Sequence, residues 1–263
     1  MSFRDYAELI AAPEPWPKRF ISSALNRGPL LLAGTSYRDP DVRHWLHVIM
    51  RDEQPRHPAL VTIVREGLGL TRDEFASVQG ALAAEWDAVG LTALQMHDLA
   101  DVAVVVRELQ CLGTPNYQSP QQRARNLWRA HHSQFAELQV RYSRELKRAS
   151  QSLAQAMGTR VHRASLWVAD GQGMLQRFAA EGAHFTSRDN LKCVPTGHDS
   201  PWIAGEAIGA EEIKFKDVER NGRIKPTWRS VLAIPIFVGA GQNSKIASAV
   251  LTFGLENTAP TLM

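Results

Sequence analysis

The sequence predicts an α/β half Rossmann-like parallel sheet, followed by an α+β domain with an antiparallel sheet, with a long helix joining the two. Three observations indicate this arrangement. Short apolar runs alternate with helical periodicity in the first half of the chain. One long helical pattern then occupies residues 121–157. The second half carries β-type runs separated by turn residues, which is typical of antiparallel hairpins.

The length of the chain predicts more than one domain. It has 263 residues, which is more than most single hydrophobic cores support. The Gly, Pro and Ser residues of 113–120 read as a linker. We therefore predict a first domain at 1–113, a linker and connecting helix at 114–158, and a second domain at 159–263 that takes the helix from residue 121 as its first element.

Composition and charge exclude several classes of protein. The net charge is +3, and the basic residues are spread along the chain, so we expect no nucleic-acid partner. Cys111 and Cys193 lie far apart and form no Cys-x-x-Cys pair, which favours a reducing, cytoplasmic setting. No signal peptide and no apolar run of about 20 residues occurs, so we expect no membrane partner.

In the first half, three apolar runs predict three parallel strands at 30–33, 59–64 and 90–95. Helices are expected between and after them. The clearest helix start is Thr71, which forms a capping-box pattern with Glu74. Three strands are half of a doubly wound sheet, so the free edge must be covered, either by a missing part of a longer protein or by a partner. We expect a homo-oligomer.

The turn after the first strand is the candidate cofactor site. Gly34, Thr35 and Ser36 follow the apolar run, and Asp39 with Pro40 then favours the start of a helix. Ligands of α/β proteins lie at the carboxyl ends of strands, which is where this turn is expected. The alternative interpretation is a strand-to-helix turn that is merely small and well capped.

The first half resembles the C-terminal half of a sirtuin-like domain. The resemblance rests on Asp5-Tyr6, the Gly34–Ser36 turn, the segment Arg38–Arg43 and the strand after His57, and it is nearest to the bacterial sirtuin-like proteins of phage-defence systems. It implies that NAD or a related nucleotide lies beside Gly34, Thr35 and Ser36. The phosphate loop and the catalytic Asn/His pair of the family are absent from the sequence, so no catalytic residue is assigned.

The connecting helix is predicted as one piece from Gln121 to Met157. It carries an apolar stripe that steps by three or four residues: Phe135, Leu138, Tyr142, Leu146, Ala149, Leu153 and Met157. The stripe faces a core, and a helix of this length also offers a surface to a second copy. Gly158 is expected to end it as a C-cap. His131 and His132 point about 100° apart, so we interpret them as surface residues and expect no metal site.

The second half resembles a GAF domain. A hairpin turn is predicted at Asp170–Gly173, and a closing hairpin over 230–253. The resemblance rests mainly on Trp202–Ile208 and Ser230–Phe253. It implies a small-molecule pocket between the sheet and the irregular middle of the domain, with aromatic walls and a few polar groups, drawn from Trp167, Phe185, Asn190, Trp202, Glu206, Asp217, Trp228 and Arg229. Each of these residues has an alternative role, in the core or on the solvated surface.

Three functions follow as hypotheses. The first is a GAF-like module that senses a small molecule or partner and is coupled to a partial, non-catalytic sirtuin-like domain, in phage defence or signalling. The second is a fragment of an NAD-hydrolysing effector whose catalytic half is missing. The third is a structural oligomerisation module. The sequence carries no Ser-His-Asp set, His-Glu-x-x-His or Walker loop, so we expect no catalysis by this chain alone.

Overall fold

The structure of the protein is a computed structural model, which describes residues 15–34, 40–53, 55–218, 227–239 and 244–258. The chain divides into two compact units, Met1–Val102 and Ala103–Met263. The division falls within a helix, α6 (Leu99–Leu109), whereas the sequence placed the boundary after residue 113. The predicted domain bounds stay a prediction.

The first unit contains a parallel sheet of three strands in the order β1-β2-β3. The strands are β1 (Leu30–Leu32), β2 (Ala59–Val64) and β3 (Leu91–Met96), all within the predicted runs or one residue beyond them. Leu30 pairs with Ala59, and Ala59 pairs with Leu91, so the three strands start in register. The prediction of an α/β parallel sheet is confirmed.

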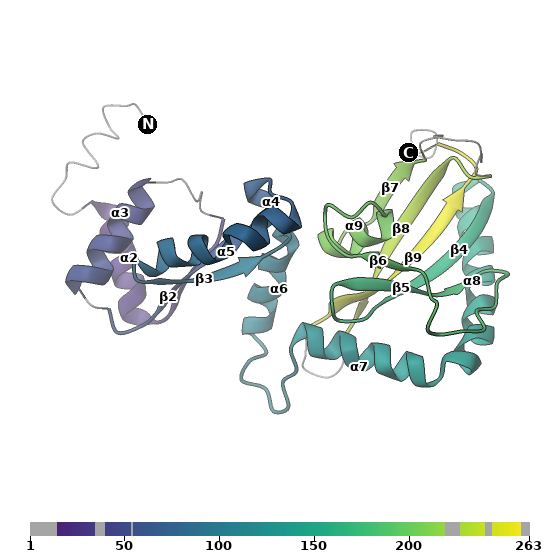
Figure 1. The fold of residues 1–263 in the computed structure, drawn as a ribbon, viewed down its shortest axis with the longest axis horizontal. Helices are drawn as coiled ribbons and strands as arrows, with labels where there is room; N and C mark the ends of the chain where they lie inside the picture. Colours follow the sequence, from purple (N-terminus) through teal and green to yellow (C-terminus); the bar gives the residue numbers. More distant parts are fainter. Residues whose placement is uncertain (1–14, 35–39, 54, 219–226, 240–243, 259–263) are drawn as a thin grey trace. The chain divides into compact units, whose positions relative to one another are not determined.

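Helices surround this sheet and close its core (Figure 1). They are α2 (Trp16–Arg27), α3 (Pro40–Val48) with the π-helical turn η1 (Ile49–Glu53), α4 (Arg65–Leu68) and α5 (Arg72–Asp87); α6 follows the last strand. The predicted capping box is present, because the Thr71 hydroxyl accepts from the Glu74 amide and the Glu74 carboxylate accepts from the Thr71 amide. The core gathers apolar side chains from α2, α3, β2, α5 and β3, among them the fully buried Trp86 and Phe75.

The second unit contains a six-stranded sheet in the order β6-β5-β4-β9-β8-β7, and every neighbouring pair is antiparallel. Its strands are β4 (Val161–Ala169), β5 (Met174–Ala180), β6 (Cys193–Pro195), β7 (Lys214–Asp217), β8 (Ser230–Val238) and β9 (Ile246–Leu255). The prediction of an antiparallel-sheet domain is confirmed. Asp170 shapes the first hairpin as expected, since its carboxylate accepts from the amides of Gln172 and Met174.

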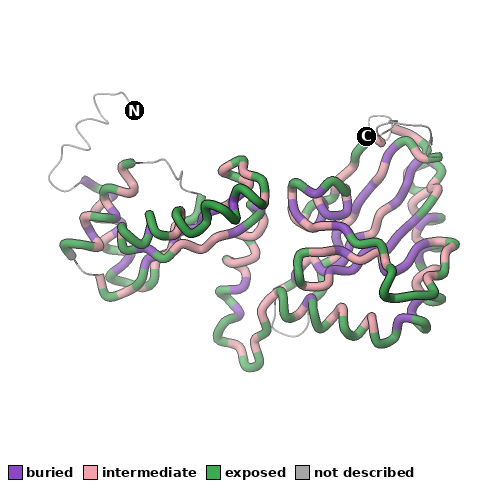
Figure 2. Tube along the Cα trace, viewed as in Figure 1, coloured by how far each residue is buried: buried purple, intermediate pink, exposed green. Residues whose placement is uncertain are grey.

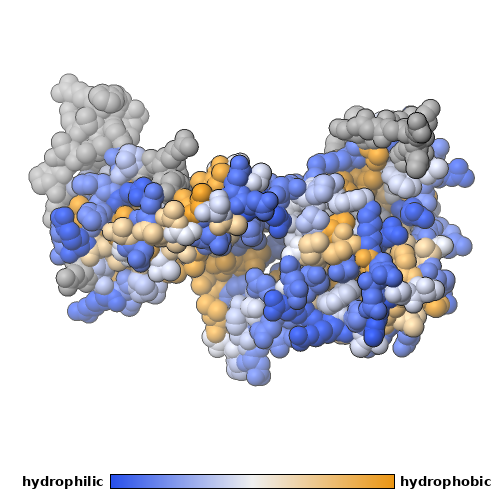
Figure 3. All heavy atoms as spheres, in the orientation of Figure 1, coloured by the Kyte–Doolittle hydropathy of each residue, from blue (hydrophilic) through white to orange (hydrophobic). Residues whose placement is uncertain are grey.

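Helices cover both faces of this sheet. On one face lie α7 (Pro120–Ser133) and α8 (Phe135–Met157), and on the other lies α9 (Ile203–Ala210) (Figure 1). Each face has its own apolar core: Phe178 and Leu166 belong to the α7–α8 side, whereas Trp167 belongs to the α9 side. Buried residues accordingly concentrate along the central strands (Figure 2). Hydrophilic side chains lie on the outward surface of α7 (Figure 3).

The connecting helix is two helices, and the prediction of one continuous helix from Gln121 to Met157 is wrong. The backbone of Gln134 leaves the helical region, at φ −106° and ψ 23°, and separates α7 from α8. The break lets both helices lie along the same face of the sheet. The predicted end of the helix is confirmed, because Gly158 adopts the left-handed conformation at φ 60°.

None of the helices in the described part of the chain combines the length and the apolar character that a membrane crossing needs.

Candidate functional site

The predicted cofactor turn lies partly outside the described residues. Gly34 is described, whereas Thr35, Ser36 and the predicted cap Asp39 are not. Gly34 is exposed, follows β1 and has φ +74°, a conformation that side chains with a Cβ rarely adopt. Among the described residues, no atom lies within 4 Å of the position that a Cβ of residue 34 would take. The contact of this turn with NAD stays a prediction.

Beside this turn, the carboxyl ends of β2 and β3 are joined by charged side chains. Arg65, the first residue after β2, is fully buried and pairs with Asp98 at 3.8 Å; it also donates to the Leu70 carbonyl at 3.0 Å. Asp101 accepts from the His97 and Asp98 amides at 3.0 Å, and burial raises the pKa of its carboxyl. These contacts fix the start of α6. No sequence pattern had pointed to Arg65 as a buried residue.

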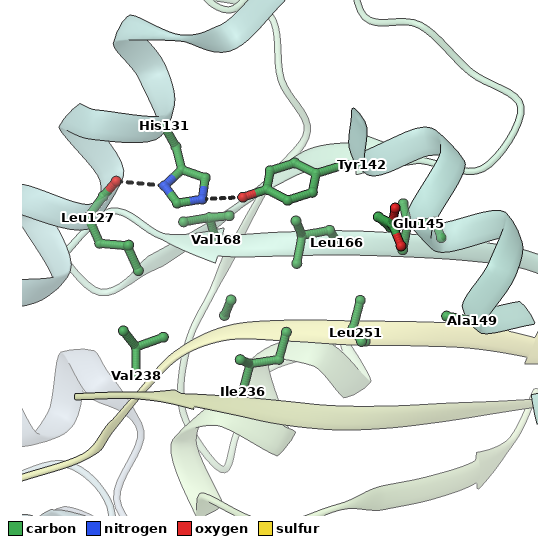
Figure 4. A pocket seen from close by; sticks show the side chains of 12 residues that line it. Leu127, His131, Tyr142, Glu145, Ala149, Leu166, Val168, Ile236, Val238 and Leu251 are labelled. Atoms are coloured by element: carbon green, nitrogen blue, oxygen red, sulfur yellow. Dashed lines mark hydrogen bonds between the residues drawn. The ribbon is translucent and has the colours of Figure 1, made fainter. Parts of the chain in front are cut away.

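The second unit contains a cavity of about 360 Å³ between the α7–α8 helices and the sheet (Figure 4). Most of its lining is aliphatic and comes from both helices and from β4, β8 and β9. The lining residues are Leu127, His131, Tyr142, Glu145, Leu146, Ala149, Leu166, Val168, Ile236, Val238, Ala249 and Leu251. This size and apolar character are typical of a small-molecule site.

Among the described residues that line the cavity, two polar side chains are at least half-buried: His131 and Tyr142. His131 on α7 and Tyr142 on α8 are hydrogen-bonded through Nε2 and the phenol oxygen at 2.8 Å, and their rings lie side by side with an interplanar angle of 9° (Figure 4). His131 Nδ1 lies 2.9 Å from the Leu127 carbonyl oxygen. A carbonyl only accepts, so Nδ1 carries the proton; in the neutral ring Nε2 then accepts from the Tyr142 hydroxyl.

Burial makes the Tyr142 phenol harder to ionise. It raises the pKa of Tyr142, so the phenol keeps its proton at neutral pH. Both rings also meet the ring of the fully buried Phe178 edge-on. Glu145, at the rim, is exposed and paired with Arg148 at 2.9 Å, so its charge is directed to solvent.

The interpretation of His131 as a surface residue is therefore wrong. It is half-buried and lies within the cavity wall, because the break at Gln134 turns α7 across the sheet. His132 is also half-buried and packs against Trp128, with 5.4 Å between ring centres. Tyr142 belonged to the predicted apolar stripe, which is where the structure places it. Helical periodicity was the one signal that pointed to it.

None of the eight residues predicted for the ligand pocket lines this cavity. Trp167 is buried in the core on the α9 side, and its indole nitrogen donates to the Thr252 hydroxyl at 2.9 Å. Trp228 is half-buried, and its ring lies beside Gly254 of β9. Trp167 therefore lies in the core, which is the alternative role considered for it and for Trp202, whereas Trp202 is exposed.

The other predicted pocket residues lie nearer the surface. Trp202 and Glu206 both belong to the α9 region, where Trp202 lies under the Lys192 ammonium and Glu206 pairs with Lys216 at 2.5 Å. Phe185 packs on the α7–α8 side of the core. Three further residues are exposed: Asn190, Asp217 and Arg229. The structure thus brings Trp202 and Glu206 together, and the pocket as a whole stays a prediction.

Comparisons with known proteins bear on the first part of the chain. Residues 1–93 match the family model described as SIR2-like domain. This match supports a sirtuin-like domain in that part of the chain, in agreement with the resemblance carried by its sequence motifs. The searches of curated proteins and of solved structures return no match.

Proposed function

We propose that the Ala103–Met263 unit is a GAF-like sensing module for a small molecule, coupled to a sirtuin-like domain that does not consume NAD in this chain alone. The cavity between α7–α8 and the sheet carries the proposal. By analogy with the phage-defence proteins that the first part resembles, the module would serve signalling or defence.

The lining defines the class of ligand. Aliphatic side chains from three strands and two helices favour an apolar body. The His131–Tyr142 pair offers one directional contact, since a ligand can accept from the Tyr142 hydroxyl in place of His131 or donate to its oxygen. The expected ligand is therefore a small, uncharged, largely apolar molecule with a single hydrogen-bonding group.

Ligand binding here is expected to act on the packing of the two helices. The cavity leaves lining atoms without neighbours, so a ligand that fills it adds contacts that the free protein lacks. Because the wall includes residues of both α7 and α8, the ligand stabilises one arrangement of these helices relative to others. A change in helix arrangement that depends on the ligand is the response expected of a sensor. The cavity therefore favours a sensing function over a purely structural role in oligomerisation.

The test uses p-cresol and toluene, which differ by one hydroxyl. Thermal shift and two-dimensional NMR titrations of the full chain are expected to show saturable binding of both, with p-cresol the tighter. Tyr142→Phe should remove the preference for p-cresol and leave toluene binding unchanged. Ala149→Leu, which fills the cavity, should weaken both about tenfold or more, whereas Ala156→Leu on the exposed side of α8 should not.

Two outcomes would contradict the proposal. One is that neither probe perturbs the amides of residues that line the cavity. The other is that Ala149→Leu binds the probes as well as Ala156→Leu does.

The NAD-hydrolase alternative draws on the family match over residues 1–93. We expect the purified chain to leave NAD unchanged, as followed by chromatography of nicotinamide release. Measurable release that depends on the protein would favour the enzyme instead.

A further inference from the structure

Three cationic side chains gather beside β5 in the second unit, away from the residues that line the cavity. They are Arg163 of β4, Arg177 of β5 and Lys192, just before β6. The backbone joins two of them, because the Arg177 amide donates to the Lys192 carbonyl at 2.8 Å. Arg177 is the cross-strand neighbour of Trp167, and Arg163 lies four positions before Trp167 on β4, so the Cβ atoms of both arginines lie on the α9 face of the sheet. The long Arg177 side chain then extends to Phe185, which packs on the α7–α8 side of the core.

Aromatic rings hold two of these cations in place. The Arg177 guanidinium lies 5.1 Å from the centre of the Phe185 ring, and the Lys192 ammonium lies 3.3 Å from the centre of the Trp202 ring. Such contacts position a cation without neutralising its charge. Because the faces of these rings contact the protein's own cations, we expect a ligand to contact the cations and not the rings.

The cluster lacks a counter-charge within the described part of the chain. None of the ion pairs formed by the described residues includes Arg163, Arg177 or Lys192. Arg177 is half-buried, and its Nε is fully shielded from solvent without a hydrogen-bond partner among the described residues. A shielded guanidinium nitrogen without an acceptor is unfavourable, and an acceptor supplied from outside would remove that cost.

Electrostatics agree with the geometry. Burial lowers the pKa of Arg177, and the charge of Arg163 lowers it further. Burial also lowers the pKa of Lys192, with a second contribution from Arg177. The three charges therefore oppose one another, and an anion between them would reverse the effect.

We propose that Arg163, Arg177 and Lys192 form an anion site for the phosphate group of a small molecule. Two planar guanidinium forks and one ammonium suit the several oxygens and the double charge of phosphate. Three cations are enough for one phosphate group, whereas the basic residues elsewhere are too dispersed for a nucleic-acid surface. The site does not depend on the cavity between α7–α8 and the sheet, and it can be tested separately.

Isothermal titration calorimetry of the full chain at low ionic strength tests the site with three probes: inorganic phosphate, AMP and adenosine. Phosphate and AMP are expected to bind at one equivalent, and adenosine is not. Arg177→Gln should weaken AMP binding at least tenfold. Arg144→Gln, which removes the same charge from an exposed position on α8, should leave it unchanged.

Because Arg177 is half-buried, two exposed variants keep the test decisive if Arg177→Gln does not fold. Arg163→Gln and Lys192→Gln should each weaken AMP binding severalfold. An NMR titration should also show the pKa of Lys192 rising when phosphate is bound. The proposal is overturned if neither phosphate nor AMP binds, if adenosine binds as tightly as AMP, or if Arg144→Gln weakens binding as much as the variants of the cluster.

Discussion

Replacement of Glu108 by glutamine should destabilise the Ala103–Met263 unit by about 2–4 kcal/mol. The Glu108 carboxylate is nearly inaccessible, with 8% of its side chain exposed. It accepts from Arg123 of α7 at 2.5 Å, from the Tyr117 hydroxyl at 2.7 Å and from the Ser244 hydroxyl. One side chain of α6 thus holds the connector, α7 and the segment before β9 together.

The magnitude follows from what glutamine can and cannot replace. Breaking a buried ion pair by removing one partner costs about 3–5 kcal/mol. Glutamine keeps one oxygen acceptor, which recovers part of a hydrogen bond worth about 1–2 kcal/mol. Arg123 also retains its bond to the Ser244 carbonyl at 3.1 Å, so its charge is not left wholly unsatisfied. The expected loss in the free energy of unfolding is therefore smaller than the cost of leaving the Arg123 charge without any partner.

The same carboxylate gives the prediction a pH dependence. Burial raises the pKa of Glu108, but the hydrogen bonds from Ser244, Tyr117 and Arg123 together outweigh it, so the pKa lies below its ordinary value of 4.5. A carboxyl whose pKa is lowered by folding stabilises the folded state above its unfolded pKa, and that contribution is lost as pH falls through the folded pKa. The difference between wild type and Glu108→Gln should therefore be full at neutral pH and shrink below pH 4.5.

Urea unfolding of the full chain measures the effect, with hydrogen exchange of the β8 and β9 amides to assign the transition to this unit. Glu256→Gln, at an exposed position of the same unit, is the matched control and should change stability by less than about 0.5 kcal/mol. Adding Arg123→Met to Glu108→Gln should cost less than the sum of the two single changes. A loss from Glu108→Gln no larger than that of the control would refute the reasoning.

Three further substitutions test contacts within one or the other unit, each by urea unfolding. Thr71→Ala removes the helix cap of α5 and should cost the first unit about 1 kcal/mol; an unchanged midpoint would count against the cap. Gly205→Ala should cost about 1–3 kcal/mol, since its Cβ would overlap the Pro195 carbonyl oxygen, and full stability would show that α9 shifts freely. Trp167→Phe should cost about 1–3 kcal/mol by leaving the Thr252 hydroxyl without its donor; a neutral result would mean that water replaces the indole.

The parts of the fold that could be predicted from the sequence are those set by local chemistry. The continuous apolar run Ala59–Val64 identified β2, because the central strand of a parallel sheet is buried on both faces, whereas the edge strands β1 and β3 are only partly buried. Thr71 and Gly158 marked helix ends because their backbone needs are met by few residue types. Asp170 marked a hairpin in the same way.

The burial of charged side chains could not be predicted from sequence patterns. Glu108 follows an apolar helical stretch and reads as a solvated end, yet it is buried because three distant donors converge on it. Arg65 and Arg177 are likewise ordinary residues in sequence. Their burial depends on contacts with residues far along the chain, which periodicity does not encode.

The cavity, too, depends on a contact that could not be predicted from the sequence. His131 and Tyr142 are eleven residues apart. In one continuous helix, with a rise of ~1.5 Å per residue, they would lie about 16 Å apart along the axis and could not touch. The break at Gln134 brings His131 Nε2 and the Tyr142 hydroxyl to 2.8 Å and opens the space between α7, α8 and the sheet. The predicted apolar stripe begins at Phe135, after the break, so it describes α8 correctly and gives no signal of the change of direction that creates the site.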